Sequence, residues 1–268
     1  MKKIVLLCGR AGSGKDTAAS MIANRFPGQT FRKAFDDPMK ELARAVFLFS
    51  NDQLWGASEH RNRIDPRLRD RKFFHECRDR FWTVGGAFLT EWLQALARSG
   101  YPLKTLGIGR PEITRRFLEW FEAWEPLDDF SGTPRHWKAK GLDVQRSPRG
   151  ILQTLGTDFG RGVHPEIWIS VALARVRDSS PGIYTFSDCR FENEIERVRL
   201  SGIPAAALLI DSGESSISST HASEHSLPSA AAFDYVIFND KPRGFEQLRG
   251  QVDQALYSLG WSDDSSSD

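Results

Sequence analysis

Residues 3–17 read Lys3-Ile4-Val5-Leu6-Leu7-Cys8-Gly9-Arg10-Ala11-Gly12-Ser13-Gly14-Lys15-Asp16-Thr17. The part up to Cys8 is a continuous aliphatic run, which is typical of a buried parallel strand. Three glycines then interrupt the run, and from Asp16 to Phe26 apolar residues recur at helical spacing. The stretch therefore predicts a strand, a glycine-rich loop and a helix in direct succession.

The loop fits the pattern G-x-x-x-x-G-K, in which glycines allow backbone N–H groups to turn toward phosphate oxygens. A helix N-terminus that follows such a loop adds a partial positive charge. We therefore expect a P-loop that binds ATP, with Lys15 reaching the β- and γ-phosphates. The predicted contacts are Gly9, Ala11, Gly12, Ser13, Gly14, Lys15, Asp16 and Thr17.

Asp16 occupies the place where the P-loop pattern usually has a Ser or Thr that contacts Mg²⁺. A carboxylate is also a good oxygen ligand for Mg²⁺, so Asp16 is the predicted metal ligand, directly or through water. Two alternatives remain open. Thr17 could take over the metal contact, or Asp16 could only stabilise the start of the helix.

Beyond the loop, short apolar strands alternate with amphipathic helices. Strands are expected at 30–35, 183–186, 205–210 and 235–238. Helices are expected from Asp37, as the cap, and at 149–160, 165–177, 192–200 and 245–259. This alternation predicts an α/β fold of the P-loop NTPase kind, in which helices cover both faces of a parallel sheet to give three α/β/α layers.

Residues 56–147 interrupt this order, because they contain five of the eight tryptophans and no clear strand. Helices are expected at 87–97 and 113–124, and the aromatic stripe of the second is read as core rather than as a ligand site. The predicted organisation is a kinase core, a helical Trp-rich insertion acting as lid or acceptor-binding region, and a disordered tail. These parts span 1–55 with 148–260, 56–147, and 261–268.

Three further segments carry a family resemblance. They are 35–40 (Phe-Asp-Asp-Pro-Met-Lys), 147–157 (Ser-Pro-Arg-Gly-Ile-Leu-Gln-Thr-Leu-Gly-Thr) and 188–194 (Asp-Cys-Arg-Phe-Glu-Asn-Glu). With the Gly-Lys-Asp end of the loop, they resemble the motifs of bacteriophage-type deoxynucleoside monophosphate kinases. The resemblance covers 4–55 and 147–250, and Asp36 departs from it because the family more often has a small residue there. It implies transfer of a phosphoryl group from Mg-ATP to a deoxynucleoside 5′-monophosphate.

The resemblance also implies site residues. Lys15, Asp188 and Arg190 are the predicted catalytic residues. The predicted acceptor-binding residues are Asp37, Lys40, Arg149, Gln153, Arg161, Arg190, Asn193 and Glu194. Arginine suits this role because its planar fork binds phosphate in a bidentate way. Capping explains Asp37, Asn193 and Glu194 equally well, and the weaker candidates are His221, Ser223 and Glu224.

The bulk properties limit the other classes. A net charge of +1 gives no reason to expect a nucleic-acid partner, and no apolar run is long enough to span a membrane. The three scattered cysteines are expected to be reduced thiols in a cytoplasmic protein.

The resemblance makes a homodimer possible. The alternatives are a kinase similar to dephospho-coenzyme A kinase or phosphomevalonate kinase, and a P-loop ATPase acting on nucleic acid.

Overall fold

The computed structural model describes residues 1–10, 12–125, 144–213, 228–239 and 244–261. Its internal contacts divide the chain into two compact units. The α/β unit consists of Met1–Phe35 and Ala172–Asp268, and the helical unit consists of Asp36–Val171. Each unit is described by itself.

The α/β unit contains a five-stranded sheet in which every pairing is parallel. Its strands are β1 (Lys2–Cys8), β2 (Thr30–Lys33), β3 (Gly182–Cys189), β4 (Ala205–Asp211) and β5 (Tyr235–Phe238). Their order is β2-β3-β1-β4-β5, which places the aliphatic run of β1 in the centre. The predicted strands are all present, although β2 ends at Lys33 rather than at residue 35 and β3 extends beyond the expected 183–186 to Cys189.

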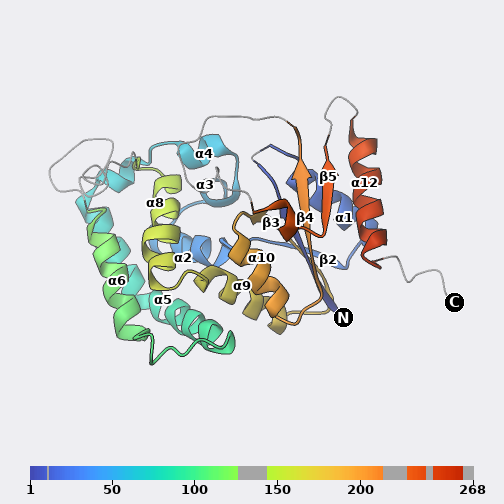
Figure 1. Cartoon of the computed structure of the whole chain (residues 1–268). Helices are drawn as coiled ribbons and strands as arrows, with labels where there is room; N and C mark the ends of the chain where they lie inside the picture. The colour runs from blue at the N-terminus through green and yellow to red at the C-terminus, as the bar shows by residue number, and fades with distance from the viewer. Residues whose placement is uncertain (11, 126–143, 214–227, 240–243, 262–268) are drawn as a thin grey trace. The chain divides into compact units, whose positions relative to one another are not determined.

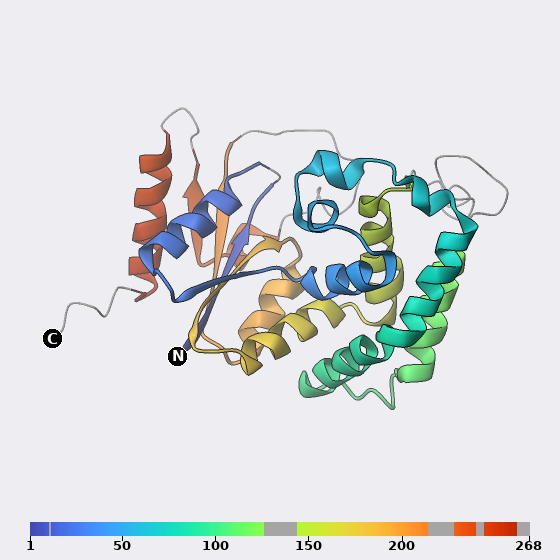
Figure 2. The same ribbon diagram turned by 180° about the vertical axis from the view of Figure 1, so that it is seen from behind.

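Helices cover both faces of this sheet (Figures 1 and 2). One face carries α1 (Lys15–Arg25) and α12 (Phe245–Ser258), and the other carries α10 (Glu192–Leu200). Between α1, α12 and the sheet lies a core that includes Val5, Leu208 and Val252. Trp261, predicted to begin the disordered tail, instead packs into this core. The predicted three-layer α/β/α fold of the P-loop NTPase kind is confirmed.

The described residues of the helical unit contain no strand. Its helices are α2 (Asp37–Phe47), α3 (Asn51–Trp55), α4 (Ser58–Asn62), the 3₁₀ helix η1 (Pro66–Arg69), α5 (Arg71–Arg98), α6 (Arg110–Glu122), α8 (Pro148–Thr154) and the π-helix η2 (Leu155–Arg161). The described residues also form α9 (Ile167–Asp178), which spans the boundary between the two units, and the 3₁₀ helix η3 (Ala230–Ala232). None of the described helices has the length and apolar character needed to cross a bilayer.

Aromatic side chains form the interior of the helical unit. Phe117, Trp120, Phe121 and Trp124 are all at least 95% buried, so the prediction that this stripe is core is confirmed. The helix expected at 87–97 starts earlier, at Arg71, because Asp70 caps it by accepting from the backbone N–H of Lys72 at 2.8 Å. The helical unit, residues 36–171, is larger than the predicted insertion at 56–147. It includes α2 because α2 packs against α5 and α8.

The helix predicted at 149–160 is divided. Regular α-helix ends at Thr154, and a π-helix, which has a wider turn, continues to Arg161. The cause lies at Trp168, whose indole N–H donates to the carbonyl of Gly156 at 3.0 Å. The same ring packs against Gly160 so closely that a Cβ there would overlap it. The sequence of 149–160 indicates a helix, but it contains no sign of the contact with Trp168.

Candidate active site

The predicted phosphate loop, residues 9–15, follows β1 and leads into α1. Gly9, Gly12 and Gly14 have positive φ angles of 146°, 74° and 101°, which L side chains rarely adopt. A Cβ added at Gly12 would meet nothing within 4 Å, so the backbone there faces open space. The loop backbone is thus open at Gly12, as phosphate binding requires, whereas a Cβ at Gly9 or Gly14 would meet other atoms at 2.4 or 2.5 Å. Ala11, which was also predicted to contact the nucleotide, lies outside the described residues.

Lys15 is the first residue of α1 and its side chain turns back over the loop. Its Nζ donates to the carbonyl oxygens of Gly9 at 2.8 Å and Arg10 at 2.7 Å. Burial lowers the pKa of this amine below 10.5, and the nearby positive charge of Arg190 lowers it further. The carboxylates of Asp16 and Asp188 act in the opposite direction.

The three predicted catalytic residues therefore lie within electrostatic range of one another. The sheet explains why, since β1 and β3 are parallel neighbours and Cys8 pairs with Cys189. The carboxyl ends of such strands meet at one edge, where α/β proteins bind ligands. Asp188 is the last residue but one of β3 and Arg190 follows the strand directly. Lys15, Asp188 and Arg190 thus gather at this edge, although 173 residues separate the first two.

Asp16 is exposed and forms an ion pair with Arg32 of β2, with 2.6 Å between Nη2 and Oδ1. The hydroxyl of Ser187 donates to the same oxygen at 3.1 Å. Among the residues that the structure describes, no three His, Cys, Asp or Glu side chains cluster as a metal site. A single carboxylate still fits Mg²⁺, which usually takes one or two carboxylates together with phosphate oxygens and water.

Glu194 is buried and acts on the backbone next to it. Its Oε2 accepts from the N–H groups of Arg190 at 2.7 Å and Phe191 at 3.0 Å. These bonds cap α10 and fix the chain at Arg190. The capping alternative for Glu194 therefore has direct support, and acceptor binding by Glu194 and Asn193 stays a prediction.

The remaining acceptor candidates belong to the helical unit. Lys40 of α2 is buried and its Nζ lies 2.9 Å from the Asp36 carboxylate, so a residue one turn into the helix neutralises the unexpected charge of Asp36. Asp37 is the first helical residue rather than the predicted cap, because Asp36 occupies the N-cap position. The Asp37 carboxylate instead accepts from the indole N–H of Trp55 at 2.9 Å.

Three acceptor candidates lie in α8 and η2, namely Arg149, Gln153 and Arg161. All three are partly exposed, whereas Ile151 and Leu155 between them are buried. Arg149 and Gln153 lie four residues apart and so share one helix face. Arg161 ends the π-helix, as the predicted helix-end position requires. The weaker candidates His221, Ser223 and Glu224 lie outside the described residues.

No protein-family model matches this chain. The deoxynucleoside-5′-monophosphate kinase of Escherichia phage T5 is 25% identical over 255 residues, which cover 85% of this chain and 86% of that protein. A protein of Acanthamoeba polyphaga mimivirus, provisionally named a deoxynucleotide monophosphate kinase, is 23% identical over 254 residues, covering 94% and 97%. The chain is thus similar over most of its length to two proteins named as deoxynucleotide monophosphate kinases.

This similarity extends over most of the chain, whereas the motifs alone gave little resemblance between residues 56 and 147. The predicted resemblance and the predicted class of enzyme, a phosphotransferase, are confirmed by it. The individual site residues stay predictions.

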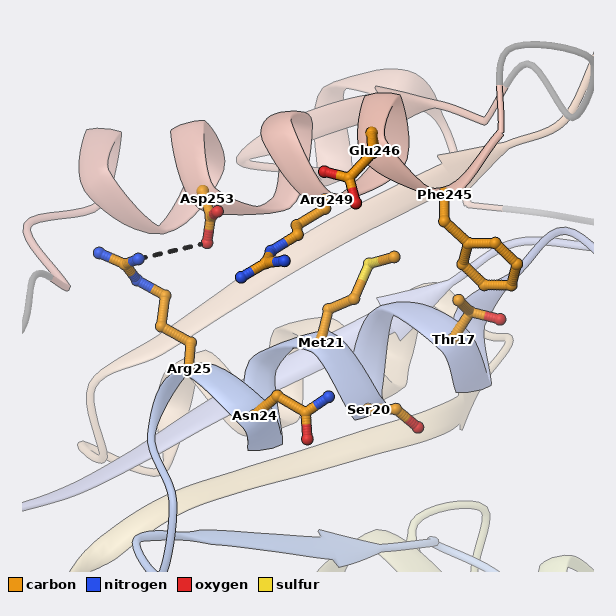
Figure 3. Close-up of a pocket in the computed structure, with 9 residues that line it drawn as sticks. All are labelled: Thr17, Ser20, Met21, Asn24, Arg25, Phe245, Glu246, Arg249 and Asp253. Atoms are coloured by element: carbon orange, nitrogen blue, oxygen red, sulfur yellow. Dashed lines mark ion pairs between the residues drawn. The ribbon is translucent and has the colours of Figure 1, made fainter.

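A groove of about 390 Å³ runs between α1 and α12 (Figure 3). Thr17 and Phe245 lie at the end next to the phosphate loop, and Arg25 pairs with Asp253 at the other end at 3.6 Å. The lining residues are Thr17, Ser20, Met21, Asn24, Arg25, Phe245, Glu246, Arg249 and Asp253. This lining mixes apolar side chains with polar and charged ones.

Sequence reasoning missed Asn239. This residue follows β5, is 9% exposed, and donates from Nδ2 to the carbonyl oxygen of Ser13 at 2.8 Å. A lone asparagine after a short strand is an ordinary turn signal. Its contact with the loop depends on the order of the strands, which no local pattern in the sequence contains.

Proposed function

We propose that the chain transfers the γ-phosphoryl group of Mg-ATP to a deoxynucleoside 5′-monophosphate, giving ADP and the diphosphate. The observation that carries this proposal is the position of Lys15. Its amine lies over a glycine loop whose backbone is open at Gly12, and within electrostatic range of Arg190 and Asp188. Similarity to two deoxynucleotide kinases supports this acceptor class.

In this proposal the loop N–H groups hold the β- and γ-phosphates, and Lys15 exchanges the carbonyls of Gly9 and Arg10 for phosphate oxygens. Arg190 offsets charge that develops during transfer. A phosphate acceptor is already an anion, so no general base is assigned. The nucleoside part of ATP is proposed to bind at the end of the groove formed by Thr17 and Phe245. This end is near the predicted phosphate site because Thr17 lies two residues after Lys15 in α1.

Asp16 is the proposed contact to Mg²⁺, which when bound neutralises charge on the phosphate oxygens. Arg32 and Ser187 hold the Asp16 carboxylate in one place beforehand. For the acceptor, Arg149 and Arg161 are the proposed phosphate contacts, since they are partly exposed guanidinium groups on the outer side of α8 and η2.

The test is ADP release from Mg-ATP with dAMP, dGMP, dCMP, dTMP and the matching ribonucleotides. Lys15→Ala removes the proposed catalytic cation, and Lys104→Ala, an exposed position of the helical unit, is the matched control. We expect turnover with at least one deoxynucleotide, lost in Lys15→Ala only. If no nucleotide of the panel gives ADP release but dephospho-coenzyme A does, the deoxynucleotide is rejected as the acceptor. ATP hydrolysis stimulated by DNA would reject the kinase.

A further inference from the structure

The end of β5 is tied to the phosphate loop by one side chain. The Nδ2 of Asn239 donates to the carbonyl oxygen of Ser13 at 2.8 Å, across 226 residues of sequence. The backbone N–H of Asn239 donates to the carbonyl of Asp211 at 2.7 Å, which fixes the residue against the end of β4. The amide therefore reaches the loop from a rigid position within the sheet.

This bond sets the direction of one loop N–H group. The carbonyl of Ser13 and the N–H of Gly14 belong to the same planar trans peptide, so they point in opposite directions. Because Asn239 holds the carbonyl on its own side, the Gly14 N–H is turned away from Asn239. The fit is close, since a Cβ at Gly14 would lie 2.5 Å from Nδ2. The absence of a Cβ at Gly14 thus leaves room for the side-chain amide of Asn239.

We propose that Asn239 is a positioning residue that orients the Ser13–Gly14 peptide for binding of nucleotide phosphate. The inference rests on the proposed nucleotide binding by this loop. Its physical basis is preorganisation, because a loop already held in its bound geometry loses less conformational freedom when the ligand arrives. Removal of the amide leaves the Ser13 carbonyl buried without this partner and lets the peptide rotate.

The neighbouring residue Gln251 provides a matched control. Its side chain accepts from the Phe238 N–H at 2.9 Å and donates to the Phe238 carbonyl at 2.8 Å, which attaches the exposed edge of β5 to α12. Gln251 thus anchors the same strand by two bonds, neither of which reaches the phosphate loop. A loss of strand anchorage and a loss of loop orientation can therefore be distinguished.

The experiment compares Asn239→Ala, Asn239→Asp and Gln251→Ala with the unmodified protein. Calorimetry measures Kd for Mg-ATP, and hydrogen exchange measures the loop amides without nucleotide. We expect Asn239→Ala to weaken Mg-ATP about tenfold and to speed exchange in the loop. Gln251→Ala should lower thermal stability while Kd stays within about twofold of the unmodified value.

Asn239→Asp adds a readout that a merely structural role would not produce. Its carboxylate would face the Ser13 carbonyl oxygen and repel it, whereas the protonated acid would donate to it. The ratio of its Kd to that of the unmodified protein should therefore fall as the pH is lowered from about 8 to about 5.5. A buried carboxyl has a raised pKa and becomes protonated in this range.

Unchanged loop exchange in Asn239→Ala, or equal loss of affinity in Asn239→Ala and Gln251→Ala, would overturn the inference. If the unmodified protein itself binds no ATP, the proposed function fails. The exchange data would in that case still decide whether Asn239 braces the loop.

Discussion

The hydroxyl of Thr154 accepts a hydrogen bond from the indole N–H of Trp124 at 3.0 Å in the interior of the helical unit. The indole of Trp120 donates to the same oxygen at 3.1 Å. Thr154 itself donates within its own helix, where its oxygen lies 3.0 Å from the Gly150 carbonyl. One hydroxyl thus satisfies two buried indoles and joins α6 to α8.

Thr154→Val should destabilise the helical unit by about 2–4 kcal/mol, because it keeps the shape of the side chain but leaves two buried N–H groups unpaired. Thr154→Ser keeps the hydroxyl and should lose about 1 kcal/mol, from the missing methyl. Urea unfolding followed by tryptophan fluorescence measures both. Equal stability of the two variants would show that the indole bonds contribute nothing.

Two helical glycines should respond to alanine in opposite directions. Gly250 in α12 is exposed and a Cβ there meets nothing, so Gly250→Ala should stabilise by about 0.5–1 kcal/mol. Gly160→Ala would place a Cβ inside the indole of Trp168 and should cost about 1–3 kcal/mol. Thermal unfolding monitored by circular dichroism measures both, and a gain at Gly160 would contradict the packing described for η2.

Arg190→Gln should raise the pKa of Lys15. Burial is the largest cause of the lowered value and remains, but the repulsion between the two cations is removed. Loss of the Lys15 proton should therefore occur at higher pH in the variant than in the unmodified protein. The ¹³Cε shift of Lys15 measures this titration. Arg199→Gln, which removes the partner of Asp234, is the control and should leave the Lys15 titration unchanged.

The three thiols should be inert in the folded protein. Cys8, Cys77 and Cys189 are free and buried. Burial raises the pKa of Cys77 to about 11, and a hydrogen bond with Cys8 followed by burial raises that of Cys189. The reactive thiolate of Cys77 is then about one part in a thousand at pH 8. A thiol-specific disulfide reagent should react within minutes only after denaturation, and rapid reaction of the native protein would contradict this burial.

Much of the α/β unit was predictable because its signals are local. The aliphatic run of β1 indicates a strand buried on both faces, and the glycines that follow have the positive φ angles that a phosphate loop needs. The helix predicted at 192–200 has the observed bounds of α10. The role of Lys15 stays a prediction, and it rests on this pattern alone because it depends on the loop directly before it.

The errors arose where a contact from another segment decided the outcome. The indole of Trp168 converts part of the predicted 149–160 helix into a π-helix. The indole N–H of Trp55 donates to Asp37, the predicted helix cap. Trp261 is buried in the core although the residues after it are Ser and Asp.

The sequence by itself determined a strand, a phosphate loop and a helix at the N-terminus, and an alternation that requires a parallel sheet. Only the tertiary structure decided that β3 and β4 flank β1. This order brings Arg190 and Asp188 to Lys15, and Asn239 to Ser13. The physical reason is that periodicity records which face of a segment is buried, whereas the identity of the neighbouring segment depends on packing across the whole sheet.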